Sequence, residues 1–138
     1  MLESDNAKQL RAESPTMQTV EGGDVSAKEL SLLASGETPM FAARPSYATL
    51  AGGNHWTLPL LLLTDRRMLI SKEKLIGKRK ANFNSEWSDV SGVSGELWNG
   101  GGPQIQLIVR TRRGSIELIV DPKYAVDVES AIRAGYLR

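Results

Sequence analysis

Residues 104–122 read QIQLIVRTRRGSIELIVDP, and this stretch decides the fold class. Apolar and polar residues alternate on both sides of a short Arg-Arg-Gly turn, which is the pattern of an antiparallel hairpin. Ile108 and Ile119 interrupt the polar face, so we expect that face to be partly covered. Asp121 and Pro122 then supply a natural N-cap and a natural first residue of a helix. The stretch therefore predicts a hairpin that leads directly into one terminal helix.

The helix expected after Pro122 has one apolar side. These apolar residues share that side: Tyr124, Ala125, Val128, Ala131, Ile132 and Leu137. Charged residues lie toward solvent: Asp127, Glu129 and Arg133. An apolar stripe opposite a charged face predicts a helix that packs on the strands.

Upstream of the hairpin, apolar segments alternate with turns. We expect strands over residues 40–48, 56–64, 67–72, 79–84 and 87–98. Pro45 indicates an edge or a bulge in the first of these, and Gly92 or Gly95 a bulge in the last. A run of short strands followed by one terminal helix predicts a mainly β (α+β) domain, a small barrel or sandwich plugged by the helix.

The Thr64-Asp65-Arg66 step lies between two of the expected strands. Its residue types favour a tight turn, which Asp65 would anchor through a side-chain to backbone hydrogen bond and local ion pairs.

The N-terminal part of the chain divides in two. Residues 1–25 are polar and contain Pro15 and a Gly-Gly pair, so we expect a disordered or loosely attached tail. Ser26 and Glu29 have the spacing of a capping box, and Gly36 suits the end of a short helix. The expected organisation is one domain over residues 26–138.

The composition excludes several classes of site. The 138 residues are 41% hydrophobic and 24% charged, with a net charge of +1 and no cysteine. The chain therefore has no disulfide, thiolate metal site or Cys nucleophile, which fits a reducing cytoplasm. The first residues carry no secretory signal, and the longest apolar stretch, 58–63, is too short to span a bilayer. We expect a cytoplasmic protein, with peripheral membrane association as an open alternative.

Three segments resemble motifs of bacterial pleckstrin-homology-like (PH-like) domains, notably the YokE-like group. They are LTDRRMLISK at 63–72, WSDVSGV at 87–93 and TRRGSIEL at 111–118. The resemblance covers roughly residues 26–138. It implies a PH-like roll or barrel of about seven antiparallel strands in two near-orthogonal sheets, capped by one C-terminal helix. Relatives that bind phosphoinositides carry several Lys and Arg in the first hairpin, whereas residues 46–55 have none.

A basic cluster is the strongest functional candidate. Residues 66–80 contain seven Lys or Arg and one acid, a local charge of seven minus one, or +6. A projecting hairpin would place Leu75 and Ile76 among these cations: Lys72, Lys74, Lys78, Arg79 and Lys80. Such a tip could contact an anionic membrane, where each cation contributes about 1 kcal/mol. The alternative is a solvated hairpin whose lysines protect a sheet edge from pairing with other chains.

Two further features could contact partners. Arginines at 110, 112 and 113 surround the last turn, but no stacking aromatic residues alternate with them, so a nucleic-acid partner is not expected. Trp98 adjoins a Gly-rich loop and could anchor a partner interface if exposed; packing at the edge of the core is the alternative.

No motif predicts catalysis. His55 is the only histidine, and a metal site or a triad would need partners that the sequence does not place. The glycines at 100–102 lack the Gly-Lys-Ser/Thr continuation of a phosphate loop. We expect no catalytic residue, no metal and no cofactor.

We therefore expect a non-enzymatic interaction module that docks to a protein partner or to a second copy of itself. An open sheet edge and a groove beside the terminal helix are natural places for a peptide strand or a subunit. Peripheral binding of anionic lipid through the hairpin 72–80 is the alternative. A small enzyme using His55 is a distant one.

Overall fold

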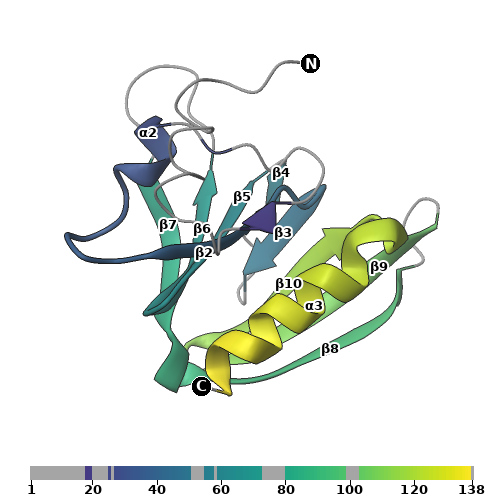
Figure 1. Ribbon diagram of the computed structural model, residues 1–138. Coiled ribbons are helices and arrows are strands. Elements are labelled where there is room, and N and C mark those ends of the chain that lie inside the picture. The colour runs from purple at the N-terminus through teal and green to yellow at the C-terminus, as the bar shows by residue number, and fades with distance from the viewer. Residues whose placement is uncertain are drawn as a thin grey trace.

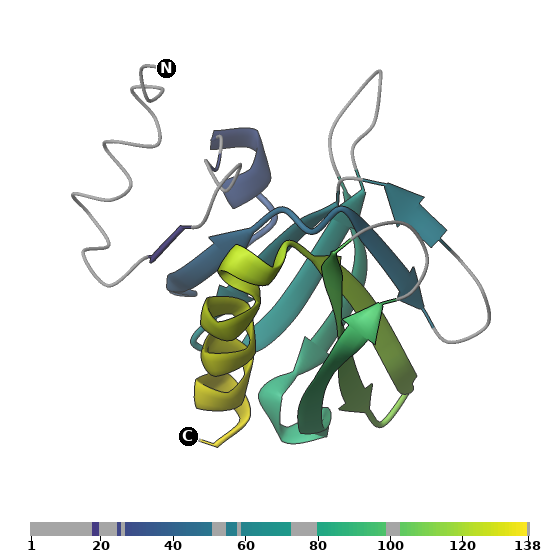
Figure 2. The same cartoon turned by 90° about the vertical axis from the view of Figure 1, so that its right-hand side faces the viewer.

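The computed structural model describes residues 18–19, 25, 27–50, 55–57, 59–72, 80–98 and 103–137. Two β-sheets and one long helix, α3 (Pro122–Tyr136), form most of this part of the chain, and α3 packs across one side of the strands (Figures 1 and 2). None of the described helices is both long and apolar enough to cross a membrane.

The first sheet has the order β1-β2-β5-β6-β7. Its strands are β1 (Gln18–Thr19), β2 (Pro39–Ala43), β5 (Leu60–Thr64), β6 (Arg67–Lys72) and β7 (Lys80–Glu86). All neighbours are antiparallel except β1, which pairs in parallel with β2. The edges of this sheet are therefore β1 and β7.

The second sheet is antiparallel throughout and has the order β4-β3-β10-β9-β8. Its strands are β3 (Tyr47–Leu50), β4 (His55–Thr57), β8 (Val90–Trp98), β9 (Gln104–Thr111) and β10 (Gly114–Val120). The predicted final hairpin is confirmed as β9 and β10, and a register shift confirms the bulge expected near Gly92.

The strand count and the closure differ from the expected roll of about seven strands. Each sheet has four longer antiparallel strands, with the short β1 or β4 added at one edge. Two expected strands are each divided between the sheets, 40–48 at Pro45 and 56–64 at Pro59, because proline cannot donate to a ladder. No pairing joins β7 to β8 among the residues that the structure describes, so the two sheets do not close into a barrel.

The main core lies between the two sheets and α3. Leu61 and Leu63 of β5 contribute to it, together with buried residues of both sheets and Val128 and Ile132 of α3. Leu60 and Leu62 point to the other face, where a second cluster contains Val25. The continuous apolar run of β5 is explained by this burial of both faces.

Helix α3 begins as predicted. The Asp121 side chain accepts from the Lys123 backbone N–H at 2.9 Å, and Pro122 is the first helical residue. The expected apolar side is confirmed at Ala125, Val128 and Ile132, whereas Leu137 is 68% exposed just after the helix.

Two other expectations need correction. The N-terminal helix α2 (Ala27–Leu30) has one turn only, although Gly36 has the expected positive φ of 79°. Ser26 lies outside the described residues, and the Glu29 carboxylate accepts from Arg44 at 2.8 and 3.0 Å. Residues 87–89 form a 3₁₀ turn, η1 (Trp87–Asp89), rather than the start of a strand.

The boundary between the tail and the domain stays a prediction, because most of residues 1–26 is not described. Within that segment, Gln18 and Thr19 pair with Phe41 and Ala42 of β2, and Val25 is buried in the second cluster.

Candidate functional site

Two of the basic residues predicted from the sequence face each other across neighbouring strands. Lys72 and Lys80 are paired at the ends of β6 and β7, so the intervening residues connect these two strands. The structure does not describe the remaining predicted members: Lys74, Leu75, Ile76, Lys78 and Arg79. The grouping of cations around an apolar tip therefore stays a prediction.

The other predicted positions have a described backbone only. His55 lies in β4 opposite Thr49, and Trp98 is the last residue of β8, opposite Gln104. Across the described side chains, no three His, Cys, Asp or Glu groups come close enough to hold a metal ion.

A buried polar cluster, which sequence analysis did not identify, fixes the turn from β5 to β6. The Glu37 carboxylate accepts from Arg67 Nε at 2.8 Å and Nη2 at 2.9 Å, from Thr64 Oγ1 at 2.7 Å, and from the Ala34 N–H at 2.9 Å. Arg67 Nη2 also donates to the Leu32 carbonyl at 3.2 Å. The Glu37 side chain is inaccessible to solvent.

These bonds determine the charge of Glu37. Burial alone would raise its pKa, but hydrogen bonds from Arg67, Thr64 and Ala34, together with the Arg67 charge, lower that pKa from 4.5 to about 2. The hydrogen bond to Glu37 in turn raises the pKa of Arg67. Both groups are therefore charged at neutral pH, and the cluster acts as a structural clamp.

The turn is anchored differently from the prediction. Thr64 Oγ1 accepts from the backbone N–H groups of Arg66 and Arg67, at 3.1 and 3.0 Å. Asp65 makes its side-chain to backbone bond outside the turn, accepting from the Thr38 N–H at 2.8 Å. The predicted tight turn is correct, but Thr64 is the residue that stabilises it from within.

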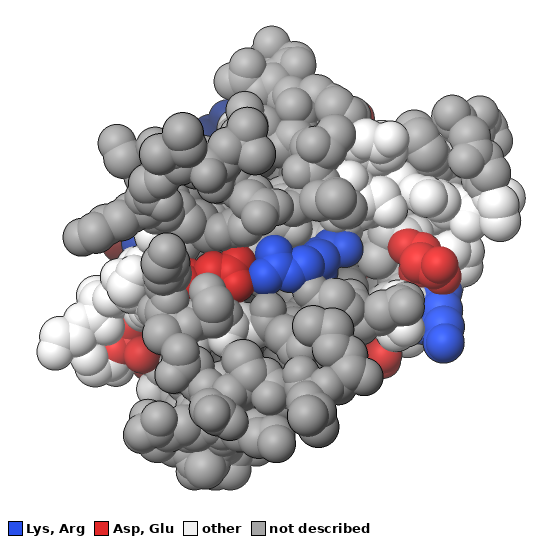
Figure 3. Space-filling model, turned by 90° about the horizontal axis from the view of Figure 1, so that it is seen from above, with Lys and Arg blue, Asp and Glu red and all other residues white. Residues whose placement is uncertain are grey.

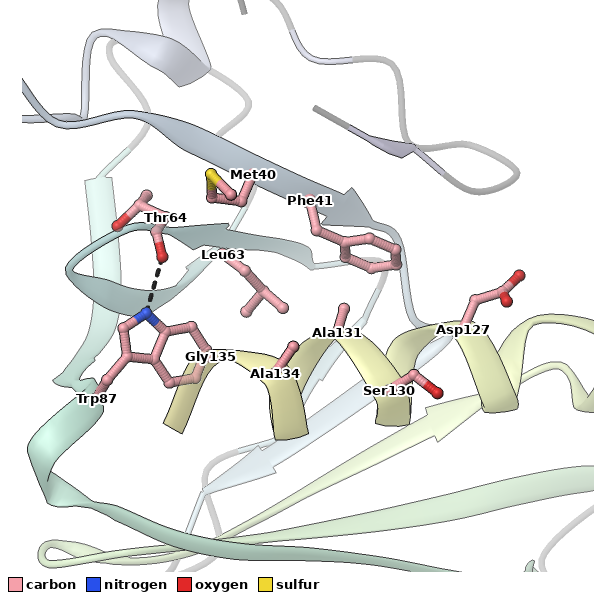
Figure 4. Close-up of a pocket in the computed structure, with 10 residues that line it drawn as sticks. All are labelled: Met40, Phe41, Leu63, Thr64, Trp87, Asp127, Ser130, Ala131, Ala134 and Gly135. Carbon is pink, nitrogen blue, oxygen red and sulfur yellow. Dashed lines mark hydrogen bonds between the residues drawn. The ribbon is translucent and has the colours of Figure 1, made fainter. Parts of the chain in front are cut away.

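Trp87 packs against both the turn and the terminal helix. Its indole Nε1 donates to the Thr64 carbonyl at 2.8 Å (Figure 4). Its ring lies against Gly135, where a Cβ would come within 2.4 Å of the ring carbons. Only glycine at position 135 allows this approach.

One groove, of about 280 Å³, lies between α3 and the first sheet. Figure 4 shows Phe41 and Leu63 on the sheet side and the small residues Ala131 and Ala134 on the helix side. The outer edge of β2, which borders this groove, is already paired with β1. An incoming strand therefore has no free ladder at this edge.

A second groove, of about 400 Å³, lies between α3 and the second sheet. Gly95, Ile105 and Leu107 contribute from the strands, and Ala125 and Val126 from α3. The absence of a side chain at Gly95 opens the groove, because a Cβ there would meet Leu107 at 3.2 Å. We call this the β8–α3 groove.

Apolar side chains are exposed at the β8–α3 groove. Leu97 is 75% exposed and Val126 is 70% exposed, and these are two of the three exposed large hydrophobic residues in the described part of the chain. Both line the groove. Val126 could have been identified from the sequence, because it is an apolar residue outside the stripe that the helix was expected to bury.

Arginines cover single carbonyls on two of the edge strands, β8 and β7. Arg133 Nη2 donates to the Val93 carbonyl of β8 at 3.2 Å and to Glu129 at 3.0 Å. Arg113 donates to the Asn84 carbonyl of β7 and lies over the Phe83 ring at 5.1 Å. Covering part of an edge limits uncontrolled pairing, and it leaves the Gly95–Leu97 end of β8 accessible.

The described charges form no large patch of one sign on the face seen in Figure 3, where acidic and basic groups lie interspersed. The arginines of the last turn have local partners: Arg110 donates to Ser94, and Arg112 pairs with Asp89 at 3.3 Å. Two of the three arginines around the last turn therefore have partners within the domain.

Comparison with known proteins identifies the fold alone. No protein-family model matches the chain, and no curated protein matches it. A solved structure of the C-terminal domain of an unknown protein from Leishmania infantum is similar, with 14% identity and a TM-score of 0.54 over 75% of this chain and 88% of that one.

Two structures of the Vav1 exchange factor are also similar. One, on the role of its PH and C1 domains, has 11% identity and a TM-score of 0.52; the other, with an allosteric inhibitor, has 12% and 0.53. Each covers 96% of this chain, which spans about a third of the Vav1 chains, 32% and 33%. The chain thus has a PH-like fold, while the bacterial YokE-like assignment has no support from these comparisons.

Proposed function

We propose that this chain is a non-enzymatic interaction module that docks an extended polypeptide segment along β8, beside α3. A partner strand would pair with the free edge of β8 and place alternate side chains in the β8–α3 groove. The motifs at 63–72 and 87–93 also favour a place among bacterial YokE-like PH-like domains.

One observation carries the proposal: an accessible edge strand, an open apolar groove and two exposed apolar side chains coincide at one place. The ladder of β8 supplies affinity that does not depend on sequence, and the groove supplies specificity. The competing groove beside β2 lacks the free edge, since β1 occupies it.

A displayed library of random peptides tests this function. We expect the wild-type domain to enrich peptides that no longer bind after Leu97→Glu or Val126→Glu, because a buried carboxylate would oppose docking. Leu137→Glu is the matched control, since Leu137 is equally exposed but lies outside the groove. The selected peptides should bind this control as they bind the wild type.

Two results would contradict the proposal. One is the absence of any enriched peptide. The other is enrichment of peptides whose affinity is the same for the wild type and for both groove variants, because such peptides would bind another surface.

Binding to an anionic membrane through the hairpin 72–80 is a second candidate. Its support is the pairing of Lys72 with Lys80, which assigns the basic sequence between them to a strand connection. Vesicles of phosphatidylcholine, with and without phosphatidylserine, test it by co-sedimentation. We expect salt-sensitive binding to the anionic vesicles that Lys74→Glu with Lys78→Glu abolishes.

Lys123→Glu, at an exposed position of α3, provides the charge control for that experiment. Equal sedimentation with neutral and anionic vesicles, or none at low salt, would remove the membrane candidate.

A further inference from the structure

We infer that a second copy of this chain is an occupant of the β8 edge, through antiparallel β8–β8 pairing about a two-fold axis. The inference rests on the proposed function, because it uses the same edge. The backbone directions and the charges of β8 favour a second copy of the chain as the partner.

The backbone polar groups of β8 point alternately toward β9 and toward the free side of the strand, as such pairing needs. The bond from Arg133 places the Val93 carbonyl on the free side of the strand. No register shift interrupts β8 between Val93 and Trp98. The polar backbone groups of Gly95 and Leu97, two and four residues further on, therefore also face the free side.

Two-fold pairing brings these positions together. An axis at Ser94 pairs Val93 with Gly95 of the other copy, and an axis at Gly95 pairs Val93 with Leu97. Each register joins residues whose backbone groups point outward, so each forms a regular antiparallel ladder. Isologous contacts of this kind are the commonest in protein dimers.

On the face of β8 opposite Leu97, an acidic group of one copy meets a basic group of the other in both registers. The Arg110 guanidinium lies 3.5 Å from the Cβ position of Gly92 and donates to Ser94 Oγ at 3.4 Å. An axis at Ser94 places Glu96 opposite Gly92 of the partner, and an axis at Gly95 places it opposite Ser94. Glu96 therefore meets the partner's guanidinium in either case.

Neither charge has a competing ion pair. Within the described ranges, Glu96 and Arg110 are both exposed and neither makes a salt bridge. Opposite charges directly across strands stabilise pairing, and the two-fold axis produces the contact twice.

The helix-facing side contributes apolar contact. A two-fold axis perpendicular to the sheet keeps both α3 helices on the same face. Leu97 and Val126 of each copy then lie at the seam between the two helices, where their exposed surfaces can be buried. Arg133 must release the Val93 carbonyl, so we expect a weak, reversible dimer rather than an obligate one.

Sedimentation velocity across a wide range of protein concentration tests the inference. We expect a monomer–dimer equilibrium in the wild type. Glu96→Arg should raise its dissociation constant about tenfold, because two attractive pairs become repulsive. The charge swap Glu96→Arg with Arg110→Glu should restore most of the affinity. Glu117→Arg, on β10 away from the edge, is the control and should leave the equilibrium unchanged.

The outcomes separate this inference from the proposed function. A wild-type monomer at every concentration, a dimer indifferent to Glu96→Arg, or a failure of the charge swap to restore it would each overturn β8–β8 pairing. Peptides selected at Leu97 would still support the proposed function after such a result. Rescue by the swap would support the inference, since a folding defect would not be corrected by a second reversal.

Discussion

At the scale of single residues, contacts between distant positions fix the end of α3. Trp87 is held by its bond to the Thr64 carbonyl, and its ring occupies the space that a side chain at 135 would need. Because the indole is bonded on one side and packed on the other, it cannot move to admit a methyl group. Gly135, a poor helix former, is required here by packing.

Gly135→Ala should therefore destabilise the domain. Overpacking costs about 1–3 kcal/mol, and the better helix propensity of Ala offsets about 1 kcal/mol of it. We expect a net loss of about 1 kcal/mol in the free energy of unfolding, measured by urea denaturation. Ser130→Ala, exposed on the same helix, should be neutral or slightly stabilising. A more stable Gly135→Ala variant would show that the Trp87 ring does not fill this space.

At the scale of elements, α3 positions both grooves, since it contacts β5 and η1 on one side and β8 and β9 on the other. Its start is defined by Asp121 and Pro122, which follow β10 without a loop. The direction of the helix is therefore coupled to the end of the final hairpin. A helix that frays at its first turn would loosen the β8–α3 groove, which Pro122 and Ala125 line.

Asp121→Ala should remove the N-cap of α3. The Asp121 side chain accepts a hydrogen bond from one of the free N–H groups of the first turn. Loss of this bond should lower the free energy of unfolding by about 1 kcal/mol. Chemical denaturation followed by circular dichroism measures this. Asp127 is an exposed residue in the interior of the same helix. Asp127→Ala should not destabilise the domain, because Ala is the better helix former. Equal losses in the two variants would contradict a capping role.

At the scale of the whole molecule, the Glu37 cluster links acid sensitivity to the global fold. It joins the segment before β2 to the β5–β6 turn, and that turn holds Trp87 against α3. The folded-state pKa of Glu37, about 2, is below its ordinary value of 4.5. The stabilisation is complete above pH 4.5 and is lost as the pH falls from 4.5 toward 2, since the unfolded chain then binds the proton more readily.

Comparison of the wild type with Glu37→Gln isolates this contribution. At neutral pH we expect the variant to be less stable by on the order of 3 kcal/mol, because Arg67 loses its counter-charge. The difference should narrow as the pH falls from 4.5 toward 2, where the wild-type carboxylate gains a proton. Urea unfolding at a series of pH values measures both curves. Curves that remain parallel across this range would exclude Glu37 as the titrating group.

The elements that could be predicted from sequence are those whose signals are local. The alternation on both sides of the last turn predicted β9 and β10, and Asp121 with Pro122 predicted the start of α3, because strand pleat, turn and cap depend on neighbouring residues. The sequence also predicted an open edge and a groove beside the helix in general terms. The sequence predicted a longer α2 than the structure contains. Its single turn is stabilised by burial against β5 rather than by its own periodicity.

Which edge and which groove are available depends instead on how the sheets and the helix pack in three dimensions. Pairing of β1 with β2 depends on residues more than twenty positions apart, and it leaves β8 as the accessible edge beside α3. Likewise, nothing near Glu37 in the sequence indicates Arg67 as its partner, 30 positions away. Long-range contacts of this kind follow from the way the two sheets and the helix pack. Local patterns do not record them, because their partners meet only when the chain has folded.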